Sequence, residues 1–196
     1  MEFASKVRWI LVITFSVIAL ILVGWGLFSI ANNLFRSNET TTTQADPSMD
    51  FLIESTKTAT YTVSGPVVAN ENHRSYTITV SESTVTMKTY KSYGQVQLGE
   101  KSYTNTPTAY KAFLSALTNA NVTAMRRNST TDTNFADKGV CATGRKFIVE
   151  LDSSLSRWST SCDTKQGNAE FNMGRVANLF QRQVPDFGTL ASGLGI

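Results

Sequence analysis

Hydrophobic residues follow three different spacings along this chain, and each spacing predicts a different kind of structure. Residues 9–35 are mostly apolar and include no charged side chain. Much of residues 57–103 alternates between apolar and polar side chains, as expected for strands with one buried face. Residues 106–120 and 169–183 carry apolar side chains three and four positions apart, which is typical of amphipathic helices. The pattern therefore predicts an apolar segment followed by a region of mixed strands and helices.

The first apolar run is long enough to cross a membrane. A hydrocarbon core of about 30 Å requires about 20 helical residues, and residues 9–32 meet this length. Lys6 and Arg8 precede the run and Arg36 follows it. The excess of positive charge before the run places residues 1–8 in the cytoplasm. We therefore predict a single-pass signal anchor that contacts the lipid bilayer of the cell membrane, with the C-terminal domain outside the cytoplasm.

A cleaved signal peptide is the alternative interpretation of this run. Signal peptides also begin with basic residues and continue with an apolar segment. The run in this chain is longer than the apolar part of a signal peptide, and no small-x-small cleavage site follows it. These two features favour an anchor that is not cleaved.

A polar, Thr-rich segment over residues 33–56 separates the anchor from the rest of the chain. Its centre has almost no large apolar side chains, so it cannot bury enough surface to offset its conformational entropy. We predict a flexible linker there. An extracytoplasmic domain is expected over residues 57–187, and a flexible, Gly-rich tail over residues 188–196.

The domain is predicted to contain four strands, a helix, two strands and a second helix. The expected strands span residues 57–64, 75–80, 85–89, 96–103, 147–151 and 155–162, and the expected helices span residues 106–120 and 169–183. Thr106 followed by Pro107 is typical of a helix start, and Gly99 predicts a bulge in the fourth strand. Runs of neighbouring strands separated by helices favour an α+β fold with a mainly antiparallel sheet. The whole chain is thus predicted to be one transmembrane helix followed by this α+β domain.

The balance of charge narrows the classes of partner. From residue 37 onward the chain has fifteen Lys and Arg against fourteen Asp and Glu. A nucleic-acid-binding protein would concentrate positive charge on one face, so this balance argues against a nucleic-acid partner. The sequence has no Gly-rich phosphate-binding loop and no zinc-ligand spacing. We therefore expect no cofactor and no metal site.

Cys141 and Cys162 are the only cysteines of the chain. An even pair of cysteines outside the cytoplasm favours a disulfide, and this pair flanks the second predicted hairpin. Closing a loop of about twenty residues contributes about 3 kcal/mol in the chain-entropy model. The alternative is a nucleophilic Cys141 with His73, the only histidine, as its base. We favour the disulfide, because a cysteine pair outside the cytoplasm is far more often structural. His73 lies in a predicted turn, where a histidine is usually solvated.

The six tyrosines all lie within residues 61–110. Exposed Tyr and Lys side chains can stack on a sugar or dock a protein, whereas the preference of tyrosine for strands offers a simpler explanation of the clustering. Four residues on or beside the third and fourth predicted strands form the candidate binding surface: Lys88, Tyr90, Tyr93 and Tyr103. We predict that this surface contacts a protein or glycan ligand.

No set of catalytic residues is recognisable in the sequence. The chain has one histidine and no Gly-x-Ser-x-Gly elbow, so an enzyme would depend on carboxylates such as Glu100, Glu150 and Asp152. These carboxylates show no recognisable pairing. We therefore predict a non-catalytic surface or interaction module. A cell-envelope hydrolase that acts on glycan or peptide through carboxylates is the alternative.

Four short motifs carry a resemblance to known proteins. They are VSGPVVA at residues 63–69, HRSY at 73–76, GVCATGR at 139–145 and WSTSC at 158–162. With these motifs, residues 61–187 resemble uncharacterised membrane-anchored or lipoprotein extracytoplasmic domains of small-genome bacteria. The resemblance implies no activity, so the prediction of function depends on the residues alone.

Overall fold

The computed structural model describes residues 55–127, 142–152, 154–162 and 166–196. The elements in these ranges are β1 (Thr58–Ser64), η1 (Asn70–Asn72), β2 (Arg74–Ser81), β3 (Thr84–Lys91), β4 (Val96–Thr104), α3 (Pro107–Asn119), β5 (Lys146–Leu151), β6 (Leu155–Thr160), α4 (Met173–Gln181) and α5 (Phe187–Ser192). No helix in these ranges is long and apolar enough to cross a membrane. The predicted span over residues 9–32 lies outside them.

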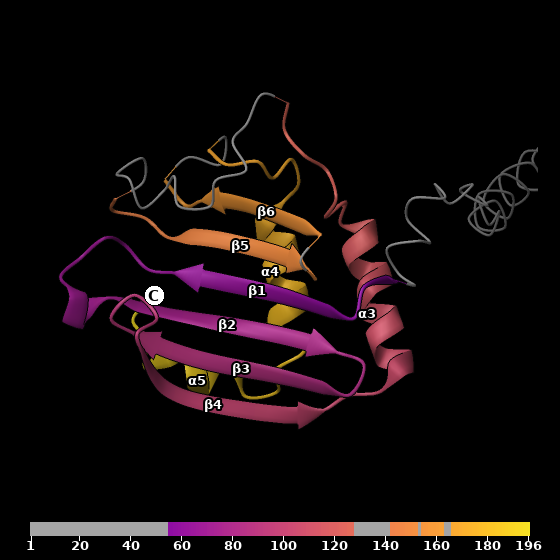
Figure 1. Cartoon of the computed structure of the whole chain (residues 1–196), viewed down its shortest axis with the longest axis horizontal. Helices are drawn as coiled ribbons and strands as arrows, with labels where there is room; N and C mark the ends of the chain where they lie inside the picture. Colours follow the sequence, from indigo (N-terminus) through magenta and orange to yellow (C-terminus); the bar gives the residue numbers. More distant parts are fainter. Residues whose placement is uncertain (1–54, 128–141, 153, 163–165) are drawn as a thin grey trace, which may run out of the picture. The chain divides into compact units, whose positions relative to one another are not determined.

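The six strands form one antiparallel sheet in the order β4-β3-β2-β1-β5-β6 (Figure 1). β1 lies inside the sheet, between β2 and β5. After β4, at one edge, the chain passes through α3 and re-enters the sheet at β5, on the far side of β1. The predicted α+β class and the predicted grouping of four strands and two strands are confirmed.

β1 shows how the alternating pattern gives the sheet two different faces. Ala59, Tyr61 and Val63 are no more than 2% exposed, and the threonines between them are partly exposed on the opposite face. In Figure 1, α4 and α5 lie behind the sheet, against the apolar face. The Thr-rich face is turned to the viewer, and no described helix covers it. We call it the open face.

α3 begins where the sequence predicts. The Thr106 hydroxyl accepts a hydrogen bond from the backbone N–H of Ala109 at 3.2 Å, and Pro107 occupies the first helical position, where no donor is needed. Four apolar side chains spaced three and four positions apart are buried against the sheet and α4: Tyr110, Phe113, Leu114 and Leu117. This spacing explains why the helix packs along one stripe.

The second predicted helix is shorter than expected. The prediction covered residues 169–183, whereas α4 spans Met173–Gln181. Ala169 instead pairs with the sheet edge, since its N–H donates to the carbonyl of Trp158 at 3.1 Å. The helix then begins after Asn172, whose side chain accepts from the N–H of Arg175 at 3.0 Å.

The sequence predicts a flexible tail over residues 188–196, and the structure places part of a helix in this segment. The chain forms a third helix, α5, and Leu194 beyond it is 7% exposed. Phe187, Leu190 and Leu194 recur at helical spacing and pack on the core, which explains the order of this segment. The three glycines between residues 188 and 195 hide this spacing in the sequence.

A short segment over residues 166–169 lies beside β6 at the sheet edge. Asn168 is completely buried, accepting from the N–H of Trp158 at 2.7 Å and donating to the carbonyl of Ser156 at 3.2 Å. Gly167 has φ +105°, and a Cβ there would lie 2.1 Å from the Trp158 carbonyl oxygen. Only glycine therefore allows the backbone to approach this closely.

We expect Gly167→Ala to lower the free energy of unfolding by about 2–4 kcal/mol, because the added methyl meets rigid backbone and the residue has a left-handed φ. The melting temperature should fall by about 10 °C. Gly188→Ala is the matched control, since a Cβ at Gly188 meets no atom within 4 Å and the residue lies in α5. Thermal unfolding of both variants tests this, and equal melting temperatures would contradict it.

Candidate functional site

Two residues of the predicted binding surface share the open face. Lys88 and Tyr90 both lie in β3, on the face opposite the buried Met87. The Lys88 ammonium is 3.5 Å from the Glu100 carboxylate on β4, and both side chains are about 40% exposed. An ion pair this exposed contributes little to stability. Lys88 and Tyr90 are thus accessible to a partner on this face.

Tyr93 holds the end of the sheet together. Its ring stacks on His73 with 3.8 Å between centroids. Its hydroxyl donates to the Val68 carbonyl at 2.7 Å and accepts from the Val68 N–H at 3.0 Å. Tyr93 is 43% exposed, so part of its ring faces solvent. The face toward His73 is covered, and the hydroxyl fixes the position of the loop that contains Val68.

Tyr103 does not belong to the same surface as the other three residues. It pairs with Val85, which is 3% exposed, so its side chain lies on the helix-covered face. There it packs against the core and its hydroxyl donates to the carboxylate of Asp186, just before α5. The structure therefore divides the predicted surface between the two faces of the sheet and the turn at Tyr93.

His73 is buried, at 2% exposure, and the expectation of a solvated turn histidine is wrong. Its Nδ1 accepts from the backbone N–H of Tyr93 at 3.3 Å, so the proton of the neutral ring lies on Nε2. Nε2 then donates to the Ser64 hydroxyl at 3.0 Å. In this arrangement His73 does not act as a base toward Ser64. Its role is to join β1, β2 and the turn after β3.

The region of the predicted disulfide is only partly described. Arg145 and Ser161 continue the pairing of β5 and β6, since the Arg145 N–H donates to the Ser161 hydroxyl at 2.8 Å and the Ser161 N–H donates to the Arg145 carbonyl at 2.9 Å. The Thr143 hydroxyl is 4.0 Å from the Cys162 sulfur. Cys141 lies outside the described residues, so the bond between the two cysteines stays a prediction.

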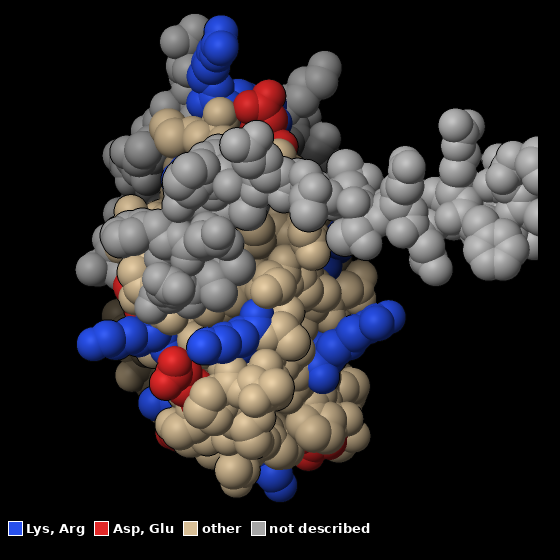
Figure 2. Space-filling view, turned by 90° about the vertical axis from the view of Figure 1, so that its right-hand side faces the viewer, with Lys and Arg blue, Asp and Glu red and all other residues tan. Residues whose placement is uncertain are grey.

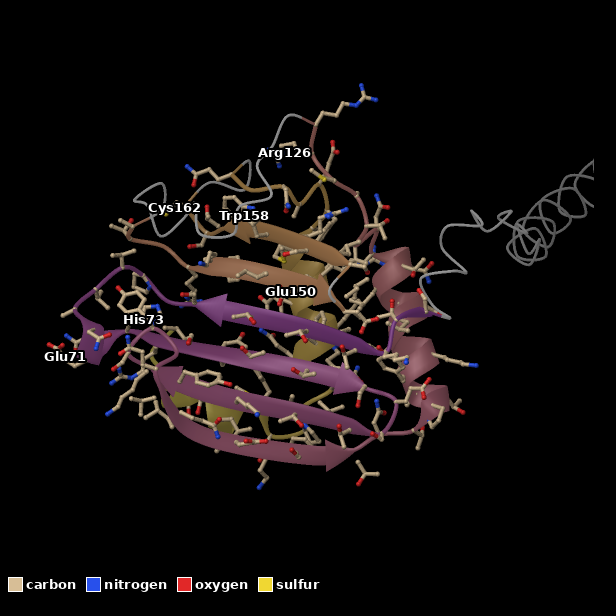
Figure 3. All side chains as sticks on the ribbon, in the orientation of Figure 1. Glu71, His73, Arg126, Glu150, Trp158 and Cys162 are labelled. Atoms are coloured by element: carbon tan, nitrogen blue, oxygen red, sulfur yellow. The ribbon has the colours of Figure 1, made fainter. Side chains whose placement is uncertain are left out.

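The candidate catalytic carboxylates do not form a pair. Glu100 interacts with Lys88 across β3 and β4. Glu150 lies on the open face near the end of β5, apart from His73 near η1 (Figure 3). Asp152 caps the start of β1, since its carboxylate accepts from Lys57 N, Thr58 N and the Thr58 hydroxyl at 2.8–2.9 Å. Asp152 thus has a structural role.

Two opposing effects act on the pKa of Asp152. Desolvation by burial raises the pKa, and the hydrogen bonds from Lys57 and Thr58 lower it, with a further contribution from the charge of Lys57. The lowering effects together are larger, so the pKa lies below the usual 3.8. Asp152 also has φ +48°, a left-handed conformation that Asp and Asn adopt more readily than other residues.

A cavity of about 460 Å³ lies between the helix-facing side of the sheet and α4. Its walls come from β1, β2, the β5–β6 hairpin, the start of α4 and the last residue of the chain. The lining residues are Tyr61, Val63, Tyr76, Arg145, Phe147, Ser159, Thr160, Ser161, Phe171, Asn172, Met173, Gly174, Ala177, Gln181 and Ile196. A volume of this size suits a small molecule.

Two tyrosines supply polar groups inside the cavity. Tyr61 is 1% exposed, and its ring stacks on Phe180 with 5.4 Å between centroids. Tyr76 is 4% exposed, and its hydroxyl accepts from the Gln181 amide at 3.4 Å. Burial raises the pKa of both hydroxyls, although the nearby charge of Arg145 opposes the rise. Both tyrosines are therefore protonated donors at neutral pH.

The cavity is the part of the site that sequence reasoning missed. Its lining comes from segments far apart in the chain, and no motif joins them. The alternating pattern correctly places Tyr61 and Tyr76 on the buried face, and Arg145 belongs to the GVCATGR motif. Nothing in the sequence shows that these three residues line one cavity, because their arrangement depends on the pairing of β1 with β5.

Figure 2 shows the face of the described domain on the side where α3 lies in Figure 1. Lys and Arg side chains stand among uncharged residues there, with Asp or Glu beside some of them.

Among the residues that the structure describes, no three His, Cys, Asp or Glu side chains gather as metal ligands. The predictions of no metal, cofactor or nucleic-acid partner stay predictions.

Comparisons with protein families, curated proteins and solved structures give no match for this chain.

We expect Asp152→Asn to lower the free energy of unfolding by about 1 kcal/mol at pH 7, because hydrogen bonds to a charged acceptor are stronger than those to an amide. Asn keeps the shape and tolerates the left-handed backbone. A carboxyl with a lowered pKa stabilises the fold above its unfolded pKa and loses this contribution as the pH falls through its folded pKa. The difference between the two proteins should therefore shrink below pH 3.8.

Denaturant unfolding at pH 7 and at acid pH measures this difference. Glu150→Gln is the matched control, since Glu150 lies near the same turn on the open face and accepts no comparable set of hydrogen bonds within the described residues. A difference between wild type and Asp152→Asn that does not change with pH would show that the carboxylate charge has no role there.

Proposed function

We propose that this chain is a membrane-anchored extracytoplasmic interaction module that binds a ligand without catalysing a reaction. Residues 9–32 would anchor it in the bilayer, residues 1–8 would face the cytoplasm, and the α+β domain would face outside. The ligand would bind in the cavity between the sheet and α4. The apolar run and its flanking charges support the location, and the chemistry of the cavity supports the binding role.

The composition of the cavity lining is the observation that carries the binding role. The lining combines aromatic and aliphatic walls with hydroxyls, an amide and one guanidinium. Binding sites for small molecules typically have such a mostly apolar surface with a few polar groups. None of the lining residues in the described part of the chain is Asp, Glu, His or Cys. A hydrolase of the glycosidase type needs two carboxyl groups about 5–10 Å apart across the substrate.

The roles of the carboxylates outside the cavity also favour binding over hydrolysis. Asp152 fixes the start of β1, and Glu100 interacts with Lys88. Neither carboxylate faces the cavity lining. A carboxylate-dependent hydrolase is therefore the weaker of the two interpretations.

The open face offers a second, wider surface for a protein or glycan. Lys88 and Tyr90 lie there, with Tyr93 at the end of the same strand, and no described helix covers them. Aromatic and basic side chains on a sheet suit such partners. We keep these three residues, without Tyr103, as the surface that would contact a macromolecular ligand.

The proposed topology predicts a specific pattern of protease protection. In intact, wall-digested cells, added protease should remove an epitope placed after residue 196 and leave an epitope before residue 1 protected. Both epitopes should be cleaved once the membrane is lysed. Protection of the C-terminal epitope in intact cells would reverse the orientation and contradict the proposal.

The proposed binding site predicts that uncharged aromatic fragments enter the cavity. We expect 4-(4-fluorophenyl)butan-1-ol to broaden its ¹⁹F signal with the full chain in lipid nanodiscs, after subtraction of binding to empty nanodiscs. Ala177→Trp should abolish this binding, because Ala177 lines the cavity and the larger side chain fills it.

Ala112→Trp is the matched control, because Ala112 is exposed on α3 and does not line the cavity. Circular dichroism should show that both variants fold. Equal binding to wild type and Ala177→Trp would mean that the fragment binds elsewhere, and no binding by any uncharged fragment of this size would contradict the cavity as a binding site.

A further inference from the structure

We propose that the cavity selects small carboxylates, meaning molecules with an apolar body and one anionic head. This inference rests on the proposed function and specifies the class of ligand. The apolar body would pack between the sheet and α4, and the carboxylate would bind Arg145 and the buried tyrosine hydroxyl.

The walls of the cavity suit an apolar body. Most of the apolar lining is only partly buried, so it presents hydrophobic surface to the interior of the cavity: Phe147, Phe171, Met173, Ala177 and Ile196. Val63 and the rings of Tyr61 and Tyr76 complete this surface. Burying apolar ligand surface there favours binding.

Positive charge at one side of the cavity suits an anionic head. Arg145 is exposed, and within the described ranges its guanidinium makes no ion pair. A guanidinium binds a carboxylate through two parallel hydrogen bonds. Arg145 lines the same cavity as Tyr61 and Tyr76, and its charge acts to lower the pKa of both tyrosines.

The N-terminus of α4 adds to this positive potential. α4 has nine residues, and its first two, Met173 and Gly174, line the cavity. The first N–H groups of a helix carry a partial positive charge. The Asn172 side chain accepts a hydrogen bond from the N–H of Arg175, and Asn172 itself also lines the cavity.

The Tyr61 hydroxyl is a hydrogen-bond donor available to a ligand in the cavity. Tyr61 is 1% exposed and lines the cavity, and its hydroxyl makes no hydrogen bond within the part of the chain described. This hydroxyl is not one of the fully enclosed polar atoms without a partner in the described residues, so it reaches the space of the cavity, where a ligand can supply an acceptor. Because burial raises the pKa of Tyr61, the hydroxyl keeps its proton and donates. A carboxylate oxygen is a suitable acceptor.

The sign of the charge follows from what the lining lacks. Among the residues that the structure describes, no Asp or Glu side chain lines the cavity, so an ammonium head would meet Arg145 and no opposite charge there. An uncharged head would satisfy the Tyr61 hydroxyl and leave the guanidinium without a counter-charge. A single carboxylate satisfies both groups.

Three ligands with the same body and different heads test this inference: 4-(4-fluorophenyl)butyrate, the matching alcohol and the matching amine. Binding is measured by ¹⁹F NMR with the full chain in nanodiscs, with empty nanodiscs as the reference. The carboxylate should bind about tenfold more tightly than the alcohol, and the amine more weakly than both.

Arg145→Gln should weaken carboxylate binding about tenfold and change alcohol binding less than twofold. Tyr61→Phe should weaken both ligands, since the alcohol also accepts from this hydroxyl. Arg175→Gln is the matched control, because Arg175 is an exposed arginine on α4 that does not line the cavity. Its carboxylate binding should equal that of the wild type.

Equal affinities for the three heads would overturn the carboxylate inference while leaving the cavity as a binding site. An equal loss in Arg145→Gln and Arg175→Gln would also overturn it, because the effect would then come from net charge. Failure of the proposed function itself has a different signature, in which the alcohol does not bind or binds Ala177→Trp unchanged.

Discussion

Phe180 is the contact on which the arrangement of the domain depends. Its side chain is fully buried, stacks on Tyr61 of β1 and meets the edge of Phe113 of α3 at 5.0 Å between centroids. One ring thus joins the sheet and two helices. Aromatic pairs in these geometries contribute more than their buried area alone. Because Tyr61 also lines the cavity, the same stack that stabilises the core sets the position of a polar group in the binding site.

Local patterns in the sequence were enough to predict most of the fold. The alternation of Ala59, Tyr61 and Val63 with threonine gave β1 and its buried face, and Thr106 gave the start of α3. The skip of one residue beside Gly99, where β3 and β4 shift register, agrees with the predicted bulge. The edge segment at Gly167 was missed because its pairing depends on close approach to Trp158, which no local periodicity records.

The candidate site could be predicted less well, since it depends on register and on long-range pairing. Tyr90 and Tyr103 were assigned to one surface because both lie in neighbouring strands. Tyr103 pairs with the buried Val85, and the side chains of paired residues lie on the same face of a sheet. Tyr103 therefore lies on the helix-covered face. Likewise, Arg145 and Tyr61 line one cavity because β5 pairs with β1, so the composition of the cavity is visible only in three dimensions.

The place of β1 in the sheet also bears on how the chain folds. One edge of β1 pairs with β2, which follows it closely in the sequence, as in Ser64 with Ser75. The other edge pairs with β5, which is far away in the sequence, as in Thr60 with Glu150. During synthesis β1 emerges long before β5, and closing so long a loop is entropically unfavourable. The edge of β1 that pairs with β5 therefore stays unpaired until the β5–β6 hairpin has been synthesised. Assembly of the sheet is thereby tied to completion of most of the chain, and β1 needs protection from wrong pairing in the interval.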